Sequence, residues 1–195
     1  MQLARCKKSG YTLVEVLVVV SIIGVLSTMG DAGLQRAVAN SRIKDAAVNT
    51  AAFVERVANL SIQRDEVLCI KVAPGSGNRK LIIIRDTTTR NCNAPNGGTI
   101  DSLIIDSPVE YESPNEHCPA MHDWANQKTS PEYKIFKPKR GLAATPPEGG
   151  ICIKYGSMDV YGAVRKEKRL NKVVPMWKVG DDNTQNSNWN NWMEL

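Results

Sequence analysis

The chain has 195 residues and a formal charge of +5, which is length enough for one long helix and one modest globular domain. Arg5, Lys7 and Lys8 supply three of these five charges, so the chain beyond residue 10 is left near +2. That small excess excludes overall basicity as an argument for a nucleic-acid-binding protein.

A short basic leader precedes a long apolar segment. Residues 1–10 end in Gly10, Tyr11 follows, and Glu15 is the one charged residue between there and Met29. A secretory signal is cleaved after its apolar core, whereas a cut after Gly10 keeps the apolar segment on the mature chain. About 17–25 residues span a bilayer, and preceding cations stay in the cytoplasm. We therefore expect a single-pass membrane helix over about 13–29, with the remaining chain exported.

Together, Gly10, Tyr11 and Glu15 resemble the prepilin signature of type IV pilins and type II secretion pseudopilins. The resemblance implies that a prepilin peptidase cuts after Gly10 and N-methylates Tyr11, where most members carry Phe. A charge inside a membrane costs about 2.5–3.5 kcal/mol and usually has a partner. The resemblance implies that Glu15 pairs with the new amine of a neighbouring subunit and sets the register of assembly. The alternative is a plain membrane-anchored periplasmic domain in which Glu15 snorkels to the interface.

The same resemblance implies a structural subunit, of the minor kind, and not an enzyme. Its partners would be other pilin or pseudopilin subunits, the prepilin peptidase, the inner-membrane assembly machinery and membrane lipid. It would lie in the bacterial inner membrane, with a cytoplasmic N-terminus and a periplasmic domain, and then in a pilus or pseudopilus. Pilus, secretion and competence machines share the signature, so the choice among them stays open.

Residues 11–64 are expected to form the N-terminal helix. Gly30 and Gly33 predict a weak point, because glycine costs about 1 kcal/mol in a helix interior. Residues 34–64 then form an amphipathic half that packs on a sheet. Its apolar positions are Leu34, Val38, Ile43, Ala47, Val48, Ala51, Val54, Ala58 and Ile62.

Short apolar runs and turn residues predict a β-rich globular domain over residues 65–195, and so an α+β, pilin-like fold. Within it, 106–133 indicates a loop insertion, and the chain from Asp181 onward is an Asn-rich tail. The expected strands are Val67–Val72, Leu81–Ile84, Ser102–Ile105, Ile135–Phe136, Ile151–Tyr155, Val160–Val164 and Val173–Val179. Ser41-Arg42 in the helix, an immediate hairpin and a late Gly149-Gly150-Ile151-Cys152 run also resemble the minor pseudopilin H and FimT-like branch.

Cysteines beyond the leader predict disulfides. Cys69, Cys92, Cys118 and Cys152 lie in a segment expected to be exported, where an oxidising compartment permits disulfides, and four cysteines allow three connectivities. We favour Cys69–Cys152, because both lie in similar strand sequences, with Cys92–Cys118 as the pair from loops. Cys6 would leave with the leader.

No residue pattern predicts chemistry or a cofactor. Nucleophile signatures, paired carboxylates and phosphate loops are missing from the sequence. His117, Cys118 and His122 are metal-ligand types, but their spacing matches no defined zinc or copper site, and a disulfide-bonded Cys with solvated histidines is preferred. Asp181-Asp182-Asn183 lacks the ligand spacing of a calcium loop. We expect no enzyme, no metal and no cofactor.

The densest basic run is Arg165–Lys172, in a segment from 134 to 178 with eleven basic and three acidic side chains, net +8. Residues 11–133 carry eleven basic and fourteen acidic ones, net −3. Such a run binds phosphates in a salt-sensitive way, and FimT-like pilins include DNA receptors. The resemblance therefore gives an alternative function, DNA binding through Arg165, Lys166, Lys168 and Arg169. The favoured interpretation is a solvated hairpin loop, or a face that pairs with acidic neighbours in a filament.

Overall fold

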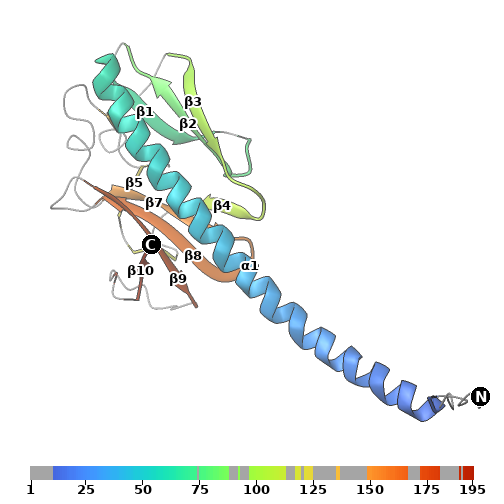
Figure 1. Ribbon diagram of the computed structural model, residues 1–195. Coiled ribbons are helices and arrows are strands. Elements are labelled where there is room, and N and C mark those ends of the chain that lie inside the picture. Colours follow the sequence, from blue (N-terminus) through green and yellow to red (C-terminus); the bar gives the residue numbers. More distant parts are fainter. Residues whose placement is uncertain are drawn as a thin grey trace, which may run out of the picture. The chain divides into compact units, whose positions relative to one another are not determined.

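A computed structural model describes residues 11–73, 75–87, 92, 97–112, 117–119, 121–124, 135–136, 149–166, 172–180, 189 and 191–195. The chain divides into two compact units, residues 1–38 and residues 39–195. Both units share the long helix α1 (Leu13–Arg64), drawn from blue to teal in Figure 1.

Helix α1 is continuous through Gly30 and Gly33, so the predicted weak point is wrong. Each glycine costs only about 1 kcal/mol, and strong helix formers such as Leu34 and Arg36 follow at once. Among the residues whose side chains are described, no helix combines the length and apolarity needed to cross a bilayer. The predicted span over 13–29 includes Thr28 and Met29, whose side chains lie outside that description.

In the second unit, α1 buries one face, as predicted. Ile43, Ala47 and Val54 have no exposed surface. Val48 and Ile62, which we expected on the same face, are each 46% exposed. Successive helical residues are rotated by about 100°, so Val48 lies more than a quarter-turn away from the buried Ala47.

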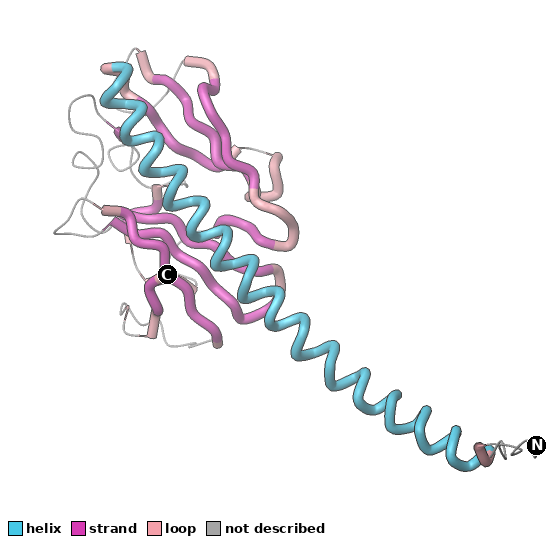
Figure 2. Tube along the Cα trace, viewed as in Figure 1, coloured by secondary structure: helices cyan, strands magenta, loops and turns pink. Residues whose placement is uncertain are grey.

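The second unit contains two sheets (Figure 2). The four-stranded sheet has the order β3 (Thr99–Ile104), β2 (Lys80–Arg85), β1 (Leu68–Val72), β6 (Ile135–Phe136), with every pair antiparallel. The six-stranded sheet has the order β10 (Met193–Glu194), β9 (Val173–Val179), β8 (Met158–Lys166), β7 (Gly149–Tyr155), β4 (Val109–Glu112). Its sixth strand, β5 (His122–Asp123), pairs parallel with β7. The α+β prediction is confirmed.

One core joins the helix to both sheets. It includes Ile43 and Val54 of α1, Ile83 of the four-stranded sheet, and Ile153 and Val164 of the other, all fully buried. Burial of aliphatic side chains stabilises a fold by about 1.5–3 kcal/mol each, so this shared core holds the second unit together.

The interpretation of 106–133 as a loop insertion is wrong for its described parts. Residues 109–112 form β4, which pairs with β7, and Tyr111 belongs to the core shared with α1. Trp124 is fully buried, and its backbone N–H donates to the Gly150 carbonyl at 2.9 Å. Val109 and Tyr111 are buried while Glu110 and Glu112 are only partly so, the alternation of a strand with one buried face. The surrounding prolines hid this short pattern in the sequence.

Two disulfides are present, but the favoured pairing is wrong. Cys69 is bonded to Cys92, with Cα atoms 5.7 Å apart, and Cys118 is bonded to Cys152, with Cα atoms 6.1 Å apart. Cys69 lies on β1 and Cys152 on β7, which belong to different sheets. A disulfide requires Cα atoms within about 4.4–6.8 Å, so each strand cysteine bonds a cysteine that lies beside its own strand, not the one in a similar strand sequence.

Candidate assembly site

The predicted cleavage and assembly residues lie at the start of α1. Gly10 is outside the described residues, and Tyr11 is 87% exposed. The Thr12 N–H donates to Glu15 Oε2 at 2.9 Å, and the Glu15 N–H donates to Thr12 Oγ1 at 3.3 Å. These reciprocal bonds form a capping box, which satisfies two N–H groups that a helix start otherwise leaves unpaired. Glu15 therefore has a partner within its own chain.

Sequence reasoning missed this local role of Glu15. The signal was present as Thr12-Leu13-Val14-Glu15, the Thr-x-x-Glu pattern that marks a helix start before an apolar run. The N-cap residue, here Thr12, typically stabilises its helix by about 0.5–2 kcal/mol, and Glu15 completes the same capping box. The carboxylate is thus held at the helix terminus whether or not a neighbouring subunit is present.

The first part of α1 exposes its apolar side chains on all sides. Each is at least 49% exposed. Large contiguous apolar surfaces normally mark a site of interaction. A helix that is apolar all round belongs in a protein core or a membrane. The exposed apolar residues of this first part of α1 are Leu13, Val14, Val16, Leu17, Val18, Val19, Val20, Ile22, Ile23, Val25 and Leu26.

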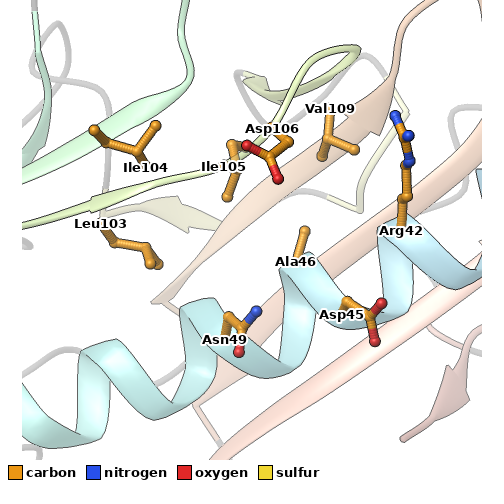
Figure 3. Close-up of a pocket in the computed structure, with 9 residues that line it drawn as sticks. All are labelled: Arg42, Asp45, Ala46, Asn49, Leu103, Ile104, Ile105, Asp106 and Val109. Carbon is orange, nitrogen blue, oxygen red and sulfur yellow. The ribbon is translucent and has the colours of Figure 1, made fainter.

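A groove of about 200 Å³ lies in the second unit between α1 and the segment that joins β3 to β4. Figure 3 shows the helix residues along one side and residues 103–109 along the other. The helix contributes Arg42, Asp45 and Asn49, and the opposite wall includes Leu103, Ile105 and Asp106. Arg42 donates through Nη1 to the Ser107 carbonyl at 3.0 Å, so its guanidinium is held at the rim. Sequence reasoning did not find this groove, because no local motif connects its two walls.

The first two residues of the basic run, Arg165 and Lys166, end strand β8 and lie on opposite faces of it. On β8, Lys166 lies on the same face as Gly162 and Val164, and Val164 belongs to the core shared with α1. Arg165 has the parity of Tyr161 on the opposite face, and its guanidinium lies 4.9 Å from the centre of the Trp189 ring. Lys166 is only 7% exposed, and burial lowers the pKa of its ammonium. Arg165 and Lys166 therefore do not share one basic surface, and Lys168 and Arg169 lie outside the described residues.

His117 packs on the outer face of the six-stranded sheet. Its ring stacks on Tyr161 with centroids 4.5 Å apart, and its Nδ1 lies 3.0 Å from Glu112 Oε2. Glu112 also pairs with Lys154 at 3.1 Å, and this hydrogen bond raises the pKa of Lys154. The expectation of a solvated His117 is therefore wrong, because a carboxylate and a ring hold it. The side chain of His122 is outside the described residues.

Within the described chain, ligand atoms of Cys69, Asp86 and Cys92 lie within 4.8 Å of one another. Both sulfurs belong to one disulfide, however, and a metal-ligating cysteine must be a thiolate. The Cys92 N–H donates to Asp86 Oδ2 at 2.9 Å, so the carboxylate also has a structural partner. This arrangement ties Cys92 to the sheet and is not a metal centre in the oxidised protein.

Comparison with known proteins locates the family signal at the N-terminus. Residues 5–30 match the family model described as the prokaryotic N-terminal methylation motif. This range contains Gly10, Tyr11 and Glu15 and stops before the second unit. The comparison with curated proteins and the comparison with solved structures each gave no match. The chain thus carries the N-terminal motif of a prepilin-type protein, in a position that supports processing and assembly as in pilins and pseudopilins.

Proposed function

We propose that this chain is a structural subunit, of the minor kind, of a type IV pilus or type II secretion pseudopilus. The methylation motif over residues 5–30 is the observation that carries the proposal. The exposed apolar side chains after Glu15 support it, because such a helix requires lipid or neighbouring helices around it. A leader in the cytoplasm, a single membrane pass and a periplasmic second unit complete the proposed topology.

Processing at Gly10 would create an amine at Tyr11, next to the capping box. Thr12 already holds the Glu15 carboxylate at the exposed helix terminus, one residue after the position of the new amine, so the carboxylate is available to the amine of a neighbour. In the low dielectric of a membrane, an opposite charge within a few ångströms is strongly favoured. We infer that the capping box orients Glu15 before assembly and that the neighbour's amine then shares its carboxylate.

Mass spectrometry of the protein isolated from its membrane tests the proposal. The expected chain begins at Tyr11 and carries the additional mass of one methyl group. A chain that keeps residues 1–10, or one that begins after the apolar segment, would contradict processing at Gly10 and favour a plain anchored periplasmic domain. Loss of the cut in a Gly10→Ala variant, with Ser9→Ala as a matched control that is still cut, would link the cleavage to the glycine.

DNA binding ranks below assembly as a function. Phosphate binding by this chain would require cations on one accessible surface. Two of the four candidates, Arg165 and Lys166, have opposite parity on β8, and Lys166 is buried. Lys168 and Arg169 then remain to form a common surface, and the net negative charge of residues 11–133 opposes it.

A further inference from the structure

The groove between α1 and the β3–β4 segment is lined by two carboxylates, one guanidinium and several apolar side chains. Asp45 and Asp106 border it, and among the described residues neither carboxylate takes part in an ion pair. Leu103 and Ile105 supply apolar surface, and Arg42 is held by the Ser107 carbonyl. An occupant that matches these walls carries an aliphatic side chain beside one or two cations.

The groove ends at an open sheet edge. Strand β3 is the outermost strand of the four-stranded sheet, and among the described strands only β2 pairs with it. Ile104 is 65% exposed at its end, and the strand contains neither Lys nor Pro. Its one charge, Asp101, is paired with Arg56 of α1 at 2.7 Å. Lysine and proline are the usual protection of an edge against pairing with another chain, and the described part of the chain gives this edge neither.

The chain itself contains a segment with the complementary chemistry. Arg165–Lys172 reads Arg-Lys-Glu-Lys-Arg-Leu-Asn-Lys, with five basic side chains and one acidic one. Leu170 follows Lys168 and Arg169, so one aliphatic residue is preceded directly by two cations. Charge complementarity between such patches steers association and fixes register. It also accounts for a basic run that the proposed function leaves unused.

We propose that this groove binds the 168–170 segment of a second copy of the chain. Leu170 would contact the apolar side chains of the groove, and Lys168 and Arg169 would pair with Asp45 and Asp106. Donor and acceptor patches differ, so the contact is heterologous and joins two copies that lie next to each other in the assembly. The inference rests on the proposed function, because the two copies must first be brought together by their N-terminal helices.

Photo-cross-linking of the full chain in membranes tests the contact. A benzophenone amino acid replaces Ile104, and the yield of copy-to-copy adduct is measured in four backgrounds: unchanged, Asp106→Lys, Arg169→Glu and the double variant. Each single charge reversal should lower the yield about fivefold, as expected for loss of an exposed ion pair, and the double variant should restore it. Glu194→Lys makes the same change on an exposed acidic residue outside the groove and should leave the yield unchanged.

The outcomes separate this contact from the proposed function. Single variants that cross-link as well as the unchanged protein would overturn the groove contact and leave assembly intact. An adduct whose mass identifies a different protein would overturn the second copy as occupant. If duplex DNA abolishes the adduct and shifts in a gel with the chain, the basic segment serves DNA and the proposal fails. If the unchanged chain forms no multimer at all, both the proposed function and this contact are contradicted.

Discussion

The Thr12 N–H donates to Glu15 Oε2 at 2.9 Å, so the carboxylate for which we propose a role in assembly also caps its own helix. A capping box accepts either Glu or Gln at this position, whereas pairing with an amine needs the negative charge. A Glu15→Gln substitution therefore separates the capping role of Glu15 from its proposed role in assembly.

We expect Glu15→Gln to keep the helix start and lose incorporation into the filament. Glu15→Ala should lose both the charge and the carboxylate half of the capping box, while the second unit stays folded and disulfide-bonded in each. Thr12→Ala is the matched control that weakens the cap and keeps the charge. Filament incorporation is measured by fractionation and helix content by circular dichroism. Normal incorporation of Glu15→Gln would contradict an assembly role for the charge.

Gly149 is expected to be intolerant of any side chain. A Cβ there would overlap the indole of Trp124, which is fully buried. Overpacking a well-packed core typically costs about 1–3 kcal/mol, so Gly149→Ala should lower the free energy of unfolding by at least that much. Gly98→Ala is the control, because a Cβ at Gly98 meets nothing within 4 Å. Urea denaturation monitored by Trp fluorescence measures both, and equal stability of the two variants would contradict the packing.

Peptide mapping under non-reducing conditions should find Cys69 linked to Cys92 and Cys118 linked to Cys152. Thiol counting in denaturant should find no free thiol in the processed chain, and one, from Cys6, in chain that keeps its leader. Replacing either pair by alanine should cost about 2–5 kcal/mol. A free thiol at Cys92 or Cys152 in processed protein would be inconsistent with these two bonds.

Tyr111 predicts a loss of stability at alkaline pH. Burial raises the pKa of its phenol far above the ordinary value of 10.0, although a hydrogen bond with Thr50 at 3.3 Å opposes that rise. Above pH 10 the unfolded chain releases this proton and the folded chain keeps it, so stability falls as pH rises. Tyr111→Phe should be about 1 kcal/mol less stable than the unchanged protein at pH 7. The difference should shrink at about pH 11, one unit above the unfolded pKa, as measured by urea denaturation, and a constant difference would exclude this cause.

Weak or no binding of duplex DNA is expected in a gel shift at low and moderate salt. If binding occurs, its salt slope should follow the phosphates neutralised, at about 0.9 counterion for each. Lys168→Gln with Arg169→Gln should then remove most of the slope, and Lys166→Gln should not, because Lys166 is buried. Tight binding that needs Arg165, Lys166, Lys168 and Arg169 together would favour a DNA receptor over a purely structural subunit.

Local sequence determined the features whose physics is local. Gly10, Tyr11 and Glu15 identify the methylation motif within a few residues. The 3.6-residue period of α1 and the β1–β2 hairpin are likewise set by neighbouring side chains and turn residues, and these predictions are confirmed.

Only tertiary structure decided the contacts between distant segments. Cys69 and Cys152 have similar neighbours in sequence, yet their strands belong to different sheets, and a disulfide depends on Cα distance and not on sequence likeness. Similarly, Arg165 and Lys166 form one basic run in the sequence, but strand alternation places them on opposite faces of β8. Arg165 lies over the Trp189 ring, and Lys166 is buried on the face that Val164 shares. The groove at Asp45 and Asp106 exists only because α1 and the β3–β4 segment, far apart in the chain, pack against one core.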